Sequence, residues 1–210
     1  MLDMLRWFAS TQIRNVAAVA GNIATASPIS DMNPVLMALG ATVVLGAAGA
    51  PPREVPLRDF FKRYRTVDMQ PHELICCVRV PDTQGPYEFV RSFKQAKRRD
   101  DDISIVNACL RVRLRPSAGG WTIDEVSSAF GGMAPTTSRA KLMEAALQGK
   151  EWSEASFDRG YAALAEDLPL PEVVPGGMAA YRQTLAASFV YKFFVGVSVE
   201  LARLAARGPQ

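Results

Sequence analysis

Hydrophobic and polar residues alternate most regularly in the middle of the chain. Leu110, Val112 and Leu114 are apolar, and an arginine follows each of them. A period of two residues is typical of a strand that buries one face and leaves the other in water. The pattern suits an antiparallel sheet. Three consecutive strands are predicted in this region, at 87–96, 103–114 and 121–130.

Apolar residues at helical spacing flank this region on both sides. Asp31 and Pro34 are typical of an N-cap and a first helical turn, and they predict a helix that ends at Gly40. Apolar runs that close at Gly or Pro predict strands at 41–45 and 73–80. The other predicted helices lie at 2–9, 138–148, 153–166 and about 178–206. Strands followed by helices make the second half of the chain α+β.

Composition and charge narrow the classes of function. The chain has 24 Lys and Arg against 21 Asp and Glu, and its net charge of +3 is too small to indicate a nucleic-acid partner. With 49% hydrophobic and 21% charged residues it is typical of a soluble globular protein. The uncharged stretch 32–52 is interrupted by Gly and Pro, so no membrane span is expected there. The first residues lack the long apolar core of a signal peptide.

The cysteines and the single histidine offer little for metal chemistry. Cys76 and Cys77 are adjacent in an apolar run and have no second Cys-x-x-Cys partner, so we expect buried thiols and no metal site. This cysteine usage fits a reducing compartment. His72 stands at a strand entrance, where we expect it to be exposed, and a single histidine excludes mechanisms that need two imidazoles.

The segment VAAVAGNIATASPISD, residues 16–31, is the first candidate site. Its side chains are small, so its backbone can approach a ligand closely, and successive backbone N–H groups in a turn can hold an anion such as a diphosphate. Gly21 and Asn22 are the pair expected at positive φ. A tight buried turn between two elements explains the same pair, and composition alone favours that structural explanation.

Two further candidates carry charge or aromatic rings. Residues 92–106, SFKQAKRRDDDISIV, place three cations before three anions between two strands, which is usually a solvated hairpin. Lys94 differs because it lies inside the predicted strand, where it can point toward a site. Arg6, Trp7 and Phe8 can stack on a planar ring, or they form part of an aromatic core.

Taken in order, these segments match one family. The chain resembles the flavin-binding part of xanthine dehydrogenase in five strings that occur in the same order and at similar spacing: RWFASTQIRNVAAVAGNIATASPISDMNPV, FFKRYR, SFKQAKRRDDDI, FGGMAPTT and LPLPEVVPGGMAAYRQTLAASFVYKFF. The resemblance covers residues 5–200, and it turns the glycine-containing segment into a strong candidate. Aldehyde oxidases share the architecture, but TASPISD followed by NP is more similar to the xanthine-oxidising branch.

The resemblance implies an α+β fold with two parts. Residues 1–82 are expected to form the second subdomain of a FAD-binding domain of the vanillyl-alcohol-oxidase type. Residues 84–206 are expected to resemble the C-terminal domain of the carbon monoxide dehydrogenase flavoprotein, with three antiparallel strands and a three-helix bundle. The segment PDTQGP, 81–86, is the expected linker. Because Met1 leads straight into a helix, we expect a fragment that lacks the upstream FAD subdomain.

The resemblance also assigns roles to single residues. Phe8 is expected to stand against the isoalloxazine ring and Lys94 to hydrogen-bond the cofactor. The other expected cofactor-binding residues are Ala18, Val19, Ala20, Gly21 and Asn22 along the cofactor, Thr25 and Asp31 near its diphosphate and ribityl parts, and Leu74 and Ile75 beside the ring. Residues expected near the flavin or the path of NAD are Arg6, Trp7, Arg65, Arg99, Asp100 and Asp101. The loop 97–102 is expected to influence whether NAD or oxygen accepts the electrons. Neither a catalytic acid or base nor a metal ligand is expected.

Two positions depart from the family pattern. The usual Ser at position 18 and the usual Gly at position 20 are both Ala here. Contacts through backbone N–H groups survive both changes, whereas a lost side-chain hydrogen bond is worth about 0.5–1.5 kcal/mol. We therefore expect weakened cofactor binding at most.

The implied function is electron transfer at FAD in a xanthine dehydrogenase-like oxidoreductase. Electrons from purine oxidation at a molybdopterin centre would pass through 2Fe–2S clusters and FAD to NAD or oxygen, in a homodimer located in the cytoplasm or in peroxisomes. The iron–sulfur and molybdenum parts are absent from these 210 residues. Two alternatives stay open: an aldehyde oxidase-like flavin module, and a truncated remnant or interaction module that does not hold FAD by itself. Substrate, electron acceptor and oligomeric state do not follow from the sequence.

Overall fold

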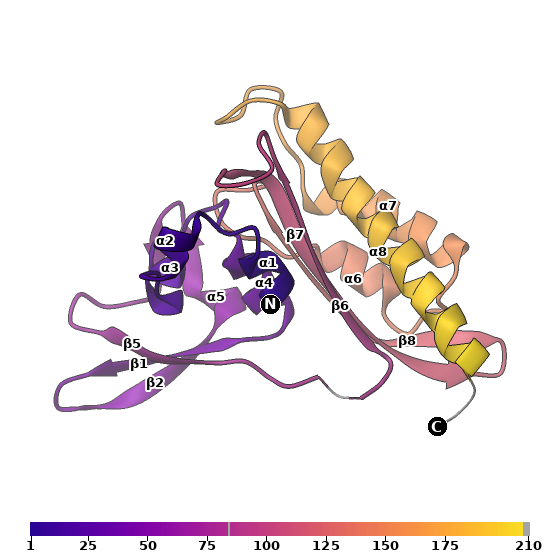
Figure 1. Ribbon diagram of the computed structural model, residues 1–210, viewed down its shortest axis with the longest axis horizontal. Helices are drawn as coiled ribbons and strands as arrows, with labels where there is room; N and C mark the ends of the chain where they lie inside the picture. Colours follow the sequence, from indigo (N-terminus) through magenta and orange to yellow (C-terminus); the bar gives the residue numbers. More distant parts are fainter. Residues whose placement is uncertain (84, 208–210) are drawn as a thin grey trace.

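The computed structural model describes residues 1–83 and 85–207 and shows two regions side by side (Figure 1). The N-terminal region combines short helices with a small sheet, and the C-terminal region is a longer sheet with three helices on one face. The α+β class predicted from the sequence is confirmed. The predicted domain boundary stays a prediction, and residue 84 of the expected linker lies outside the described residues.

The N-terminal region is built from short elements. Its helices are α1 (Leu2–Leu5), α2 (Thr11–Arg14), α3 (Val19–Ala24), α4 (Met32–Ala38) and α5 (Leu57–Phe60). Its strands are β1 (Thr42–Ala47), β2 (Ala50–Pro56), β3 (Phe61–Arg63), β4 (Thr66–Val67) and β5 (Leu74–Arg79). Strand β1 lies at the centre of an antiparallel sheet of order β2-β1-β5, and β3 and β4 form a separate two-stranded sheet.

Strand β2 is a feature that the sequence pattern does not predict. It contains Pro51, Pro52 and Pro56, which cannot donate to a ladder of hydrogen bonds. The strand tolerates them because it lies at the edge of its sheet, where one side of the backbone needs no partner. Its pairing with β1 places Val55 opposite Val43, and both side chains are buried.

Helix α4 forms the centre of the N-terminal core, and all seven of its residues are buried. Gly40 ends it at a φ of 75°. The Gly40 N–H donates to the Met37 carbonyl at 3.0 Å, and the Ala41 N–H donates to the Leu36 carbonyl at 2.9 Å. This pair of bonds is a Schellman motif, in which glycine adopts the left-handed conformation at no steric cost.

Asp31 occupies the N-cap position of α4, as predicted, but it does not cap the helix with its side chain. The hydroxyl of Ser30 accepts the Asn33 N–H instead, at 3.3 Å. The carboxylate of Asp31 is thereby free to reach across to the second sheet.

The C-terminal region has longer elements. Its strands are β6 (Glu88–Ala96), β7 (Ser104–Ser117) and β8 (Gly120–Gly131), antiparallel in the order β6-β7-β8. Its helices are α6 (Lys141–Leu147), α7 (Glu154–Asp167) and α8 (Ala179–Arg207). The three strands and three helices predicted for this half are confirmed. In Figure 1 helix α8 runs in nearly the same direction as the long strands β6 and β7.

The sheet β6-β7-β8 belongs to two hydrophobic cores. Val106, Ala108, Leu110 and Val112 of β7 pack with the helices α6, α7 and α8. On the other face, Cys109 packs with α4 and the N-terminal core. Beyond Leu110 arginines occupy that second face, as the alternating pattern predicts, but only Arg115 is exposed, and Arg111 and Arg113 are half-buried.

The expectation about the adjacent cysteines is wrong. Cys76 and Cys77 are both exposed on β5, whereas Ile75 and Val78 of the same strand pack partly against the N-terminal core. The buried cysteine is Cys109, and burial raises the pKa of its thiol to about 12. His72 is exposed, as expected. Among the described residues no group of His, Cys, Asp and Glu is arranged to hold a metal ion.

Helix α8 is long and apolar enough to cross a membrane by length and composition. Core helices of globular proteins pass the same test, and Phe189, Val190, Phe193 and Val197 of α8 pack into the C-terminal core. Its other face carries Tyr191, which is 59% exposed. The expectation that the chain has no membrane partner stays a prediction.

Candidate functional site

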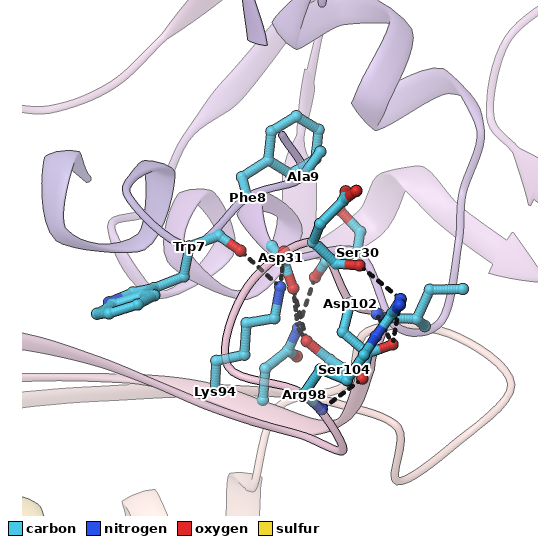
Figure 2. A network of polar contacts seen from close by, with 12 residues as sticks. Trp7, Phe8, Ala9, Ser30, Asp31, Lys94, Arg98, Asp102 and Ser104 are labelled. Atoms are coloured by element: carbon cyan, nitrogen blue, oxygen red, sulfur yellow. Dashed lines mark hydrogen bonds and ion pairs between the residues drawn. The ribbon is translucent and has the colours of Figure 1, made fainter. Parts of the chain in front are cut away.

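A buried ion pair joins the two regions. The ammonium group of Lys94 on β6 donates to Asp31 Oδ2 at 2.6 Å and to the carbonyl oxygen of Trp7 at 2.8 Å (Figure 2). Only 9% of the Lys94 side chain and 8% of the Asp31 side chain are exposed. The structure thus brings together three residues from segments far apart in the sequence, all of which the family resemblance assigns to the site.

Two residues that the sequence analysis missed complete the surroundings of Asp31. Asp31 Oδ1 accepts hydrogen bonds from the Ser104 hydroxyl at 2.6 Å and from the Asn107 side-chain amide at 3.4 Å. The same amide donates to the Ser30 carbonyl at 3.0 Å and to the Ser104 hydroxyl at 3.2 Å. The sequence contains an indication of both residues, because Ser104 and Asn107 are polar residues within the otherwise apolar run SIVNACL.

Trp7 contacts the guanidinium group of Arg99 and lines two cavities. The guanidinium carbon of Arg99 stands 5.6 Å from the centre of the Trp7 ring, a cation–π contact. Trp7 also lines two cavities, one of about 510 Å³ and one of about 300 Å³. The larger cavity is basic, since Lys94, Lys97, Arg98 and Arg99 face a single acidic residue, Asp3. In the smaller one, Arg6 and Arg14 face Asp100 and Asp101.

Phe8 has a different orientation from its neighbour. In Figure 2 its ring points to the side opposite Lys94. Its carbonyl oxygen accepts a hydrogen bond from Arg14 Nη1 at 2.7 Å, and the carbonyl of Ala9 accepts another from the same nitrogen at 2.8 Å. Trp7 and Phe8 are half-buried and belong to neither hydrophobic core, so the alternative of an aromatic core cluster is not supported.

The loop 97–102 is held by its own hydrogen bonds. Asp102 accepts the Arg98 N–H at 2.7 Å and the Ile103 N–H at 2.9 Å, and the side chain of Arg98 donates to the Asp101 carbonyl at 2.8 Å. The Arg98 N–H is the main reason why the pKa of Asp102 is lowered. The loop therefore closes on itself while Arg99 reaches Trp7, so the cation–anion run is more than a solvated hairpin.

The glycine-containing segment does not form the expected turn. Gly21 and Asn22 lie in helix α3, and neither has a positive φ. Ile23 explains the helix, because its side chain is fully buried in the N-terminal core. Positive φ occurs instead at Ala26, at 45°. The predicted anion-binding turn at this pair is therefore wrong, although the segment stays at the surface.

Local hydrogen bonds occupy the polar groups of this segment. The Thr25 hydroxyl donates to the Asn22 carbonyl at 2.7 Å, and the Ser30 hydroxyl donates to Asn22 Oδ1 at 2.7 Å. Thr25 itself is exposed. Its expected contact with a cofactor stays a prediction.

Exposed apolar side chains lie in this segment and on the neighbouring strand β5. Val16 is 81% exposed, Val19 44% and Leu74 of β5 74%, and α3 contacts β5. Ala18 is also exposed and Ala20 is half-buried, so little side-chain bulk covers the backbone of α3. Exposed apolar patches of this kind mark contacts with a ligand or with another part of a protein. Ile75, next to Leu74, packs partly against the N-terminal core.

Arg65 also lies outside the network around Lys94 and Asp31. It lies at the turn between β3 and β4 with a φ of 51°, and its guanidinium carbon stands 5.8 Å from the centre of the Tyr64 ring. Its expected place near the flavin stays a prediction.

Comparison with known proteins accounts for both regions. Residues 1–83 match the family described as the FAD binding domain in molybdopterin dehydrogenase, and residues 91–197 match the CO dehydrogenase flavoprotein C-terminal domain. The chain belongs to the flavoprotein family of the molybdopterin dehydrogenases. The resemblance inferred from the five strings is thereby confirmed.

Curated relatives of this flavoprotein include enzymes with different names. Xanthine dehydrogenase of Oryza sativa subsp. japonica is 48% identical over 201 residues, and the match covers 96% of this chain and 15% of the relative. Nicotinate hydroxylase of Emericella nidulans is 49% identical over 199 residues, which are 94% of this chain and 15% of the relative. The chain therefore spans about one seventh of the length of the relatives it matches.

Solved structures agree on the fold. Carbon monoxide dehydrogenase of Hydrogenophaga pseudoflava superposes with a TM-score of 0.82 over 94% of this chain and 66% of that chain, at 24% identity. Quinoline 2-oxidoreductase of Pseudomonas putida 86 has a TM-score of 0.78 over 95% of this chain and 66% of that chain, at 22% identity. At these identities the likeness shows the architecture alone.

The residues present fit the flavin ring of FAD. A lysine ammonium carries three hydrogens, two of which bond to Asp31 and Trp7, so the third has no acceptor among the described residues. Carbonyl oxygens of a flavin are suitable acceptors for it. The exposed Val16 and Leu74 suit the apolar faces of a flavin ring.

Proposed function

We propose that this chain is the FAD-binding, electron-transferring part of a xanthine dehydrogenase-like enzyme. In that enzyme electrons from purine oxidation reach FAD through iron–sulfur clusters and leave to NAD or oxygen. The observation that carries the proposal is the ammonium group of Lys94, held between Asp31 and the Trp7 carbonyl with one donor to spare. When bound, FAD supplies the redox chemistry, and the protein binds, orients and tunes it.

Each part of the site has a role in this proposal. Lys94 donates its remaining hydrogen to the flavin and brings a positive charge close to it, which favours electron density on the ring. Leu74 and Val16 exclude water from the apolar faces of the ring. Asp31 keeps the lysine in place and balances its charge at 2.6 Å.

We further propose that NAD accepts the electrons from the reduced flavin. A dinucleotide carries two negative phosphates, and the basic cavity of about 510 Å³ next to Trp7 offers Lys97, Arg98 and Arg99 to such an anion. The cation–π contact of Arg99 with Trp7 ties the loop 97–102 to this cavity. Reoxidation of the reduced flavin by NAD⁺ in the complete enzyme tests this point, and reaction with oxygen alone would support the aldehyde oxidase-like alternative.

The substrate is proposed at the level of an N-heteroaromatic ring, with purine as the first choice. Xanthine dehydrogenases support purine, and nicotinate hydroxylase, which matches as closely, supports a pyridine ring. The molybdenum and iron–sulfur parts of such an enzyme, and a homodimer, are further components of the proposal. A cytoplasmic location is supported by three free cysteines, two of them exposed.

Retention of FAD by the purified chain tests the core of the proposal. We expect that the chain, mixed with FAD and passed through gel filtration, carries the visible absorbance of oxidised flavin. A flavin-free chain would favour the second candidate, a remnant or interaction module that keeps the fold without the cofactor. The exposed apolar surface at Val16 and Leu74 is the observation that favours this second candidate, because another protein segment would cover it equally well.

A neutral variant of the ion pair separates binding from folding. Lys94→Ala alone leaves Asp31 buried and unpaired, which costs about 3–5 kcal/mol of stability. The double variant Asp31→Asn/Lys94→Met removes both charges and keeps similar volumes, so we expect it to fold and to lose FAD. Lys141→Ala, at an exposed lysine of α6, serves as the control and should retain FAD. Unchanged flavin content in the double variant would remove Lys94 from the site.

A further inference from the structure

We propose that Ser104 and Asn107 are positioning residues of the flavin site, which act on Lys94 through Asp31. The inference rests on the proposed function, because Lys94 is the group that would touch FAD. Neither residue faces the cofactor in this proposal. Their task is to hold one oxygen of the Asp31 carboxylate, so that the other oxygen holds the ammonium group of Lys94.

The geometry around Asp31 supports this role. Ser104 and Asn107 donate to Oδ1 at 2.6 and 3.4 Å, while Lys94 donates to Oδ2 at 2.6 Å. Ser104 is 4% exposed and Asn107 is fully buried. A carboxylate with donors on both oxygens cannot rotate without breaking a bond, and in a buried site no water replaces the lost partner. Ser104 and Asn107 of β7 therefore determine, through Asp31, where the ammonium group of Lys94 points.

The glycine motif FGG explains how Asn107 keeps its place. Gly131 of β8 pairs with Asn107 of β7, and a β-carbon on Gly131 would lie 2.2 Å from Asn107 Oδ1 and 3.1 Å from the Pro28 carbonyl oxygen. The next residue, Gly132, donates its N–H to the same carbonyl at 2.8 Å and has a φ of 82°. Only glycine leaves room here for the Asn107 side chain to reach the segment that carries Ser30 and Asp31.

The test measures Lys94 directly, with and without FAD. In the 210-residue chain, acylation of each lysine is followed by mass spectrometry, with the exposed Lys141 and Lys192 as internal standards. Ser104→Ala and Asn107→Ala should raise the acylation rate of Lys94 about 3- to 10-fold, the factor expected for one lost hydrogen bond. Ser104→Thr, which keeps the hydroxyl, should restore slow acylation.

A matched control separates positioning from general loosening of the core. Asn33 is also fully buried, lies two residues from Asp31 and makes no side-chain hydrogen bond within the described chain. Asn33→Ala leaves a cavity beside Asp31 but breaks no side-chain hydrogen bond, so Lys94 acylation should stay at the wild-type rate. Wild-type acylation in both Ser104→Ala and Asn107→Ala would overturn the inference, and so would an equal increase in Asn33→Ala.

FAD binding supplies the second readout. If the wild-type chain binds FAD, Ser104→Ala and Asn107→Ala should raise its dissociation constant by about the factor seen in acylation and should shift the visible flavin spectrum. An altered acylation rate without any FAD binding by the wild-type chain would contradict the proposed function and leave the positioning of Lys94 supported. Normal affinity and spectrum in variants with fast acylation would show that Lys94 does not touch the flavin.

Discussion

Strands β5 and β7 lie in three-stranded antiparallel sheets of the same chain, and they differ in what covers them. On β7, Val106, Ala108 and Val112 are fully buried under the C-terminal helices. On β5, Leu74 is 74% exposed and both cysteines face solvent. The C-terminal region therefore completes its core within the chain. The N-terminal region presents an apolar edge strand that suits a ligand or another protein segment.

The largest effect should come from the completed core. Phe193 on α8 is 2% exposed, and Phe193→Ala should lower the free energy of unfolding by about 3–5 kcal/mol because it leaves a cavity. Tyr191→Ala, on the exposed face of the same helix, should change it by no more than about 0.5 kcal/mol. Urea denaturation followed by circular dichroism measures both. An equally large loss in Tyr191→Ala would mean that this face of α8 is covered in solution.

A smaller effect should come from the ion pair between Arg53 and Glu73 in the N-terminal region. Arg53 on β2 donates to Glu73 at 2.6 Å, and this bond together with the Gln70 N–H lowers the pKa of Glu73 from its ordinary value of 4.5 to about 2. A folded-state pKa below the unfolded one means that the stabilisation is complete above pH 4.5 and is lost as the pH falls toward 2.

The variant Glu73→Gln tests this pH dependence, because its stability should vary less with pH than that of the wild type. The wild-type urea midpoint should fall between pH 4.5 and 2 more steeply than that of Glu73→Gln. Asp59→Asn is the control, since the partner of Asp59 is the neighbouring exposed Arg58. Parallel pH profiles for wild type and Glu73→Gln would contradict the role of Arg53.

The smallest effect on stability is expected for Leu74→Ser, which should nevertheless lower the affinity for FAD. Leu74→Ser removes an apolar side chain that already stands in water, so the free energy of unfolding should change by at most about 0.5 kcal/mol. FAD affinity should fall, because apolar contact with the ring is lost. Val173→Ser, 91% exposed in the loop before α8, should change neither quantity. A large loss of stability in Leu74→Ser would show that β5 is covered in the free chain.

The site was only partly predictable for a physical reason that Asp31 illustrates. The family strings pointed to Asp31, Lys94 and Trp7, and the structure brings them within hydrogen-bond distance. Ser104 lies 73 residues from Asp31, and no local pattern records a hydrogen bond over that separation. The turn predicted at Gly21 was wrong because small residues occur in both turns and helices, so the local pattern could not decide between them. The burial of Ile23 in the N-terminal core favours the helix.

The sequence by itself determined the elements with strong periodicity and the family. Alternation at Leu110, Val112 and Leu114 and the apolar runs of the last three helices are local properties, so they can be read without knowing the partners. The tertiary structure alone decided which faces are covered: the adjacent cysteines became exposed, while Cys109 and Asp31 became buried. Burial and hydrogen bonding depend on segments that are distant in the sequence, and here α4 packs against both β7 and β8.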